Sequence, residues 1–221
     1  QEKLKSKLIA GVKNGRIPHS QLFLGKSGFG GLPLALAYAQ YISCINPTDS
    51  DSCGECSSCR KMQSITHPDM HFSFPFPSDK AKKSSDLMVE WRAVLTEKPY
   101  VNLQDWMSAL GAEKKQANFP IAECREIIRS LSLKPFESEY KFLVLWLPEY
   151  LGNEGNVLLK IIEENMALVC IHQNLNMEII KFMKYAKVRE IIHEGSPERE
   201  YNIEYFGVEN NLDVFISTIK S

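Results

Sequence analysis

The spacing of apolar residues changes several times along the chain and predicts alternating helices and short strands. Leu4, Leu8 and Val12 recur every four residues, which places them on one face of a helix. The run Gln-Leu-Phe-Leu at 21–24 ends at a glycine and is typical of a buried strand. On the same criteria, helices are predicted at 4–12, 33–44, 87–95, 103–110, 121–131, 155–164, 177–192 and 212–219, and strands at 21–24, 70–76, 141–147 and 167–171.

This alternation of strands and helices favours an α/β fold with a mostly parallel sheet, and the pattern near the end of the chain predicts a C-terminal part that is mainly α. The length of 221 residues allows one large domain or two small ones, and a hydrophobic content of 44% can form a sizeable core. No apolar run reaches the about 18 residues of a membrane-spanning helix. The charged start QEKLKSK also lacks the apolar core of a signal peptide. We therefore expect a cytoplasmic protein with no membrane partner.

The charge balance argues against a protein that binds nucleic acid over its whole surface. Lysine and arginine total 26 against 27 acidic residues, which gives a net charge of −1. The lysines within 80–83 favour a solvated loop over a phosphate contact. Phe72, Phe74 and Phe76 alternate along the chain, and we interpret them as core-facing rather than as a platform for stacked bases. Any DNA contact is therefore expected to come from a local patch or from partners.

Four of the six cysteines crowd into the segment 44–59 and predict a metal site. Their spacing is C-x8-C-x2-C-x2-C, and the four ligands are Cys44, Cys53, Cys56 and Cys59. Two residues between cysteines let a tight turn aim both sulfurs at one point, as tetrahedral zinc requires. Four thiolates leave no coordination position open for water, so the predicted zinc is structural rather than catalytic.

Other states of these cysteines remain open at this point. They can be reduced thiols or form two disulfides, and the CxxC pairs can be redox-active. The absence of an export signal favours metal binding over disulfides, and no thioredoxin-like context surrounds the CxxC pairs. Cys124 and Cys170 lie apart from the cluster and are expected to be small buried apolar residues.

A glycine-rich turn between the predicted strand at 21–24 and the next helix has the position of a phosphate-binding loop. The working motif reads GxxxxGK[ST], in which glycines expose backbone N–H groups to phosphate oxygens. Gly25 and Gly30 occupy the two glycine positions, with Gly28 between them. Gly31 stands where the lysine belongs, and Leu32 stands where serine or threonine belongs. The loop is therefore predicted to be degenerate, and an ordinary glycine-rich turn is an equally good interpretation of this segment alone.

The other residues that an active ATPase needs are also missing from this sequence. Lys26 and Ser27 lie too early in the loop to replace the missing pair. An active ATPase should carry adjacent carboxylates at the end of a buried strand. After the strand predicted at 141–147 only Glu149 stands nearby, and a solvated loop residue is the favoured interpretation of it. We therefore expect no ATP turnover and no bound ATP.

Taken together, these motifs resemble the bacterial DNA polymerase III clamp-loader family, which belongs to the AAA+ class. The order and spacing of the segments carry the resemblance more than any one of them. The matching segments are 16–25 (RIPHSQLFLG), the loop 25–31 (GKSGFGG), the cysteines at 44–59, 66–69 (THPD), 127–129 (IIR) and 156–164 (NVLLKIIEE).

The resemblance implies an AAA+ P-loop-type domain over 1–164 with an inserted zinc module at 44–59. Because the lysine and the acidic pair are missing, it implies a non-hydrolysing stator subunit of a ring that loads the sliding clamp on primed DNA. The implied partners are the ATPase subunit (gamma/tau) and the delta subunit, with the clamp and primed DNA contacted through the complex. The implied location is the bacterial cytoplasm.

The chain departs from the family pattern after residue 164. A Ser-Arg-Cys-type motif, whose arginine reaches into the neighbour's ATP site in the family, is missing, so no arginine finger is assigned. We interpret 165–221 as the remainder of the AAA+ core with a remnant of the lid or collar region.

Two other functions stay open from the sequence. One is an active AAA+ ATPase that uses Lys26 or a partner's residue, and the other is a zinc-containing adaptor that binds DNA by itself. His67 and Asp69 invite a catalytic interpretation, but a turn that starts a strand explains Thr-His-Pro-Asp better.

Overall fold

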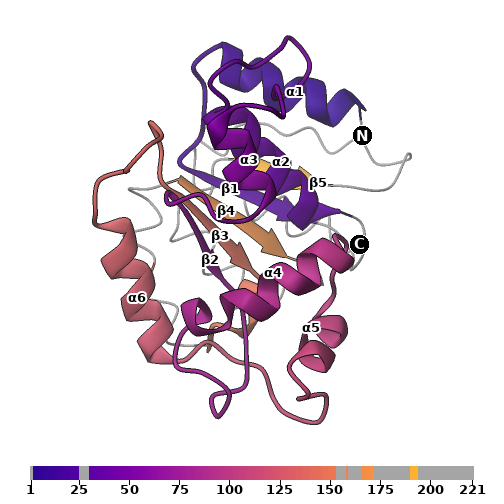
Figure 1. Ribbon diagram of the computed structural model, residues 1–221, viewed down its shortest axis with the longest axis vertical. Coiled ribbons are helices and arrows are strands. Elements are labelled where there is room, and N and C mark those ends of the chain that lie inside the picture. The colour runs from indigo at the N-terminus through magenta and orange to yellow at the C-terminus, as the bar shows by residue number, and fades with distance from the viewer. Residues whose placement is uncertain (1, 25–29, 153–157, 159–165, 172–189, 194–221) are drawn as a thin grey trace, which may run out of the picture.

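The computed structural model describes residues 2–24, 30–152, 158, 166–171 and 190–193 (Figure 1). The helices are α1 (Glu2–Lys13), α2 (Gly31–Ser43), α3 (Ser57–Gln63), α4 (Met88–Glu97), α5 (Leu103–Ala109) and α6 (Ile121–Leu131), with short 3-10 turns η1 (Ser84–Leu87) and η2 (Pro148–Tyr150). The strands are β1 (Ser20–Leu24), β2 (Met70–Ser73), β3 (Phe142–Trp146), β4 (Met166–Ile171) and β5 (Glu190–His193). In this part of the chain, no helix is both long and apolar enough to cross a membrane.

The five strands form one sheet in the order β2-β3-β4-β1-β5, and every neighbouring pair is parallel. Parallel neighbours require crossover connections, and α4, α5 and α6 lie in the connection from β2 to β3. The prediction of an α/β protein with a parallel sheet is therefore confirmed. The sheet also continues past residue 164, since β4 lies between β1 and β3.

Strand β3 is buried on both faces because helices cover both sides of the sheet. Its side chains alternate, and Phe142, Val144 and Trp146 join the main core. Figure 1 shows α2 and α4 in front of this face. Leu143 points to the opposite face, where it lines a cavity together with Ile127 of α6. This double burial explains why β3 is a continuous apolar run in the sequence.

Aromatic rings fill the core beneath α4. Trp91 of α4 stacks on Phe74 with ring centroids 4.3 Å apart and lies 5.0 Å from Trp146 of β3. Trp106 of α5 packs edge-on against Trp91 at 5.1 Å. Phe72, Phe74 and Phe76 are all buried, so the core-facing interpretation of these alternating rings is confirmed.

Several expectations for secondary structure need correction, and others fall outside the described residues. The predicted strand at 70–76 ends at Ser73, and Phe76 pairs only with Asn118 in an isolated bridge. The helix predicted at 177–192 is wrong at its end, because 190–192 belong to β5, where adjacent β-branched Ile191 and Ile192 favour a strand. In the C-terminal part, the predicted strand at 167–171 is confirmed as β4, and β5 is a second strand where a mainly α part was expected. The stretches 177–189 and 212–219 lie outside the described residues, as does nearly all of 155–164.

Candidate metal centre

The four cysteines predicted as ligands come together where α2 ends and α3 begins. Cys44 directly follows α2, Cys56 caps the N-terminus of α3, and Cys59 lies in its first turn. All four sulfurs lie within 4.8 Å of one another. Cys44 Sγ is 3.5 Å from Cys53 Sγ, and Cys53 Sγ is 3.9 Å from Cys59 Sγ. All four thiols are free, which contradicts the disulfide alternative, and the cluster can bind a metal ion.

Backbone N–H groups donate hydrogen bonds to these sulfurs, in the way that stabilises a thiolate. The N–H of Cys53 donates to Cys44 Sγ at 3.2 Å, and the N–H groups of Cys56 and Cys59 donate to Cys53 Sγ and Cys56 Sγ, each at 3.4 Å. Burial acts to raise the pKa of Cys56, but hydrogen bonds from the N–H groups of Cys59 and Ile45 outweigh it and lower that pKa to about 6. The cluster thus holds at least one sulfur ready to ionise near neutral pH.

The fourth sulfur is harder to ionise in the absence of a cation. Burial, together with hydrogen bonds to the neighbouring thiols, raises the pKa of Cys59 to about 12. A bound divalent cation reverses this situation, because a coordinating thiol loses its proton outright. The arrangement therefore favours a metal-bound cluster over four neutral thiols.

The loop that carries Cys53 is fastened to the helices beside it. Lys5 of α1 pairs with Asp51 at 2.7 Å, and the hydroxyl of Tyr41 in α2 donates to the carbonyl of Thr48 at 3.3 Å. Gly54 adopts a φ of 74°, a left-handed conformation that suits glycine and turns the chain between Cys53 and Cys56. Exposed ion pairs add little stability, so a metal ion held by the four cysteines would contribute most of the order in this loop.

Only the end of the glycine-rich segment falls within the described residues. Gly30 has a φ of 99° and caps the N-terminus of α2, and Gly31 is the first residue of that helix. A Cβ at Gly31 would meet the carbonyl oxygen of Phe23 at 3.6 Å, an ordinary contact, so space alone does not exclude a side chain there. Gly25 and Gly28 lie outside the described residues.

Glu149 was expected in a solvated loop, and the structure places it elsewhere. It lies in η2, directly after β3, and is half-buried rather than exposed. Because parallel strands end at the same edge of a sheet, η2 lies at the edge where β1 leads into the glycine-rich segment. Glu149 thus stands at the strand end where an ATPase carries its acidic pair, but its neighbours Pro148 and Tyr150 supply no second carboxylate.

The buried carboxylate of Asp69 fastens the loop that precedes β3. It accepts hydrogen bonds from the backbone N–H groups of Phe136, Glu137 and Ser138 at 2.6, 2.8 and 2.9 Å. The N–H of Asp69 itself donates to Nδ1 of His67 at 3.2 Å. These contacts support the turn interpretation of Thr-His-Pro-Asp and give both side chains structural roles.

A second buried carboxylate, which the sequence did not reveal, joins α6 to the far end of β2. Glu123 is 2% exposed and accepts from the hydroxyl of Ser73 at 2.6 Å and from the N–H of Ser84 at 2.7 Å. Burial raises its pKa above the ordinary value despite these donors. The helical spacing of α6 places Glu123 on the same face as Ile127, which was the available signal.

We expect Glu123→Gln to flatten the pH dependence of stability. Because the folded state holds this proton more tightly than the unfolded state, wild-type stability should fall as pH rises from 4.5 through the raised pKa. Urea midpoints measured between about pH 4 and 8 should show this fall in the wild type and a smaller one in the variant. The exposed Glu90→Gln is the matched control and should follow the wild type. Parallel profiles for wild type and Glu123→Gln would contradict the assignment.

Comparison with known proteins identifies the family. The family model described as "DNA polymerase III, delta subunit" matches residues 1–177, which is well over half of the chain. The chain belongs to the DNA polymerase III delta subunit family. This match covers the four cysteines, the glycine-rich segment and strands β1 to β4.

Relatives of this DNA polymerase III family match shorter stretches. The chain is 38% identical over 69 residues to DNA polymerase III subunit delta' of Escherichia coli, covering 31% of this chain and 21% of that protein. It is 32% identical over 75 residues to subunit delta' of Bacillus subtilis, covering 34% and 22%. Subunit tau/gamma of Haemophilus influenzae is 32% identical over 63 residues, covering 28% and 9%. The matches span about a fifth of the two delta' relatives. The predicted resemblance to the bacterial DNA polymerase III clamp-loader family is therefore confirmed, and the similarity is to its delta' members.

Proposed function

We propose that this chain is a non-hydrolysing stator subunit of the bacterial DNA polymerase III clamp loader, built on an AAA+ P-loop-type domain that covers 1–164 and continues into β4. In this role it helps to load the sliding clamp on primed DNA in the bacterial cytoplasm. The family match over 1–177 is the observation that carries the proposal. The parallel sheet, in which β1 leads through the glycine-rich segment into α2, supports the AAA+ assignment.

The residues at the nucleotide position support the non-hydrolysing role. Gly31 and Leu32 replace the lysine and the hydroxyl residue that hold phosphate and magnesium. Leu32 is also 1% exposed, so it belongs to the core rather than to a phosphate site. Glu149 stands without an adjacent acidic residue after β3. A nucleotide would therefore meet backbone N–H groups but none of the charged groups that drive phosphoryl transfer.

We further propose that the four cysteines hold one structural zinc ion. Zinc–sulfur bonds of about 2.3 Å in a tetrahedron place the sulfurs about 3.8 Å apart. The distances of 3.5 and 3.9 Å between the sulfurs of Cys44, Cys53 and Cys59 are close to this value. With four sulfurs as ligands, the ion would fasten the end of α2 to the start of α3 and would take no part in a reaction.

Assembly is the decisive test of the proposed role. The full chain, mixed with the gamma/tau ATPase and the delta subunit of the same source, should elute as one complex of defined stoichiometry in gel filtration with light scattering. The chain alone should turn over ATP no faster than a buffer blank, because the lysine and the acidic pair are missing. A chain that elutes alone would overturn the stator proposal. ATP turnover that is lost in Lys26→Ala would instead establish the active-ATPase alternative.

A further inference from the structure

Strand β2 is an edge strand, and part of its outer edge carries backbone groups with no partner among the described residues. The N–H of Phe142 donates to the carbonyl of Asp69, and the register pairs Met70 with Phe142 and Phe72 with Val144. In this parallel register the odd-numbered residues of β2 bond to β3, so the N–H and C=O of Phe72 point outward.

The two ends of this edge are already satisfied by the protein itself. The N–H of Met70 donates to the carbonyl of His67 at 3.1 Å. At the other end, the hydroxyl of Ser84 accepts from the N–H of Phe74 at 3.2 Å and donates to its carbonyl at 3.3 Å. Between them, the carbonyl of Met70 and both backbone groups of Phe72 have no hydrogen bond to any described residue. These three groups are what one added strand would bond.

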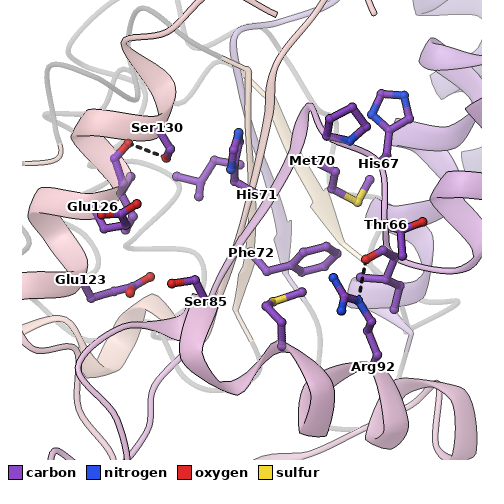
Figure 2. Close-up of a pocket in the computed structure, with 15 residues that line it drawn as sticks. Thr66, His67, Met70, His71, Phe72, Ser85, Arg92, Glu123, Glu126 and Ser130 are labelled. Carbon is purple, nitrogen blue, oxygen red and sulfur yellow. Dashed lines mark hydrogen bonds between the residues drawn. The ribbon is translucent and has the colours of Figure 1, made fainter. Parts of the chain in front are cut away.

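A cavity of about 300 Å³ lies along this edge of β2. Figure 2 shows it between α6, which carries Glu123, Glu126 and Ser130, and α4, which carries Arg92. Met70 and Phe72 line it from β2. Its volume is at the lower end of the about 300–1,000 Å³ typical of ligand pockets, which suits two or three residues of extended chain.

Among the charged groups that line the cavity, Glu126 is paired with cations, whereas Arg92 on the opposite wall has no carboxylate partner among the described residues. Glu126 already pairs with Lys83 at 3.0 Å and with Arg129 at 2.6 Å. Arg92 donates from Nε to the carbonyl of Ile65 at 2.9 Å, as Figure 2 shows, and has no carboxylate partner among the described residues. Its remaining guanidinium N–H groups can therefore bind a carboxylate from outside.

We propose that this cavity binds an extended peptide segment of a partner protein. The segment pairs with Phe72 as an additional strand and places an aspartate or glutamate side chain at Arg92. Main-chain hydrogen bonds to the edge supply the binding, and the carboxylate supplies selectivity. Because the cavity lies between α4 and α6, its volume of about 300 Å³ suits a single extended chain. This inference concerns a surface separate from the cysteine cluster and does not depend on the clamp-loader role.

A short peptide tests this proposal on the full chain. The probe is acetyl-Thr-Val-Asp-Val-Thr-amide, titrated to about 2 mM into labelled protein and followed by amide NMR shifts. We expect a saturable downfield shift and slower hydrogen exchange at the Phe72 N–H, because that group gains a hydrogen bond. The same peptide methylated on its backbone nitrogens should bind at least about tenfold more weakly, because it cannot donate to the edge.

Variants of Arg92 test the charge. Arg92→Gln and Arg92→Lys both lose the Nε contact with Ile65, but only the lysine keeps the positive charge. A control peptide carries asparagine in place of the aspartate. Arg92→Gln should weaken binding of the aspartate peptide by about fivefold and should not alter binding of the asparagine peptide. Arg92→Lys should bind the aspartate peptide more tightly than Arg92→Gln does.

Three outcomes would overturn the proposal. The first is no saturable shift at Phe72 up to the highest peptide concentration. The second is equal affinity of the aspartate and asparagine peptides for the wild type. The third is a doubled mass in light scattering together with protection of the Phe72 N–H before peptide is added, since a second copy of the chain would then cover the edge.

Discussion

Replacing Cys56 by serine should abolish binding of the proposed zinc ion and unfold the segment 44–63. Metal analysis of freshly purified wild-type protein should find about one zinc ion per chain, and the variant should contain none. Zinc-binding energy is folding energy where a site does not exist in the unfolded chain, so we expect a loss of several kcal/mol in this segment. Serine also caps helices well, so the start of α3 keeps its capping group and the loss reports on the metal.

A cysteine outside the cluster provides the matched control. Cys124 of α6 is fully buried but is absent from the group of sulfurs that lie within 4.8 Å. Cys124→Ala should cost about 1 kcal/mol for the lost sulfur while zinc content stays the same. Wild-type protein without zinc, or a Cys56→Ser variant that keeps it, would contradict the assignment of the ligands.

Local sequence signals were sufficient for the cysteine cluster and for most of the sheet. The spacing C-x2-C-x2-C places three of the cysteines within the short segment 53–59, so the sequence limits where their sulfurs can lie. The run at 141–147 also predicted β3, because a strand covered on both faces needs apolar residues at every position. In both cases, neighbouring residues carry the whole signal.

Features that depend on distant partners could not be predicted in this way. Short apolar runs do not distinguish a strand from a helix, and pairing with β1 makes 190–193 a strand despite a helical pattern upstream. The role of Asp69 depends on N–H groups nearly seventy residues later in the chain. Glu123 likewise bonds to Ser73 and Ser84 from other elements. No spacing rule connects such residues, because tertiary contacts bring them together.

Replacing Asp69 by alanine should destabilise the fold by about 3 kcal/mol. Its carboxylate is fully buried and accepts from three backbone N–H groups in the loop before β3. Alanine leaves these donors without an acceptor where β2 and β3 begin, and each unsatisfied donor costs about 1 kcal/mol or more. Asp69→Asn should destabilise the fold less than Asp69→Ala, because the amide oxygen still accepts a hydrogen bond. Some loss should remain, because the amide NH2 group faces a backbone N–H donor. Urea unfolding followed by far-UV circular dichroism measures both.

The pH dependence of the stability lost in Asp69→Ala identifies the Asp69 carboxylate as the source of the stabilisation. Burial opposes ionisation of Asp69, but the N–H groups of Glu137, Phe136 and Ser138 outweigh it and hold its pKa below 3.8. The stabilisation by the ionised Asp69 carboxylate is therefore present above its pKa in the unfolded state. It is lost as pH falls through its pKa in the folded state. The stability gap between wild type and Asp69→Ala should narrow in acid. Asp49→Ala, which removes an exposed partner of Lys13, should leave the urea midpoint essentially unchanged. An equally small effect of Asp69→Ala would show that water replaces the carboxylate in this loop.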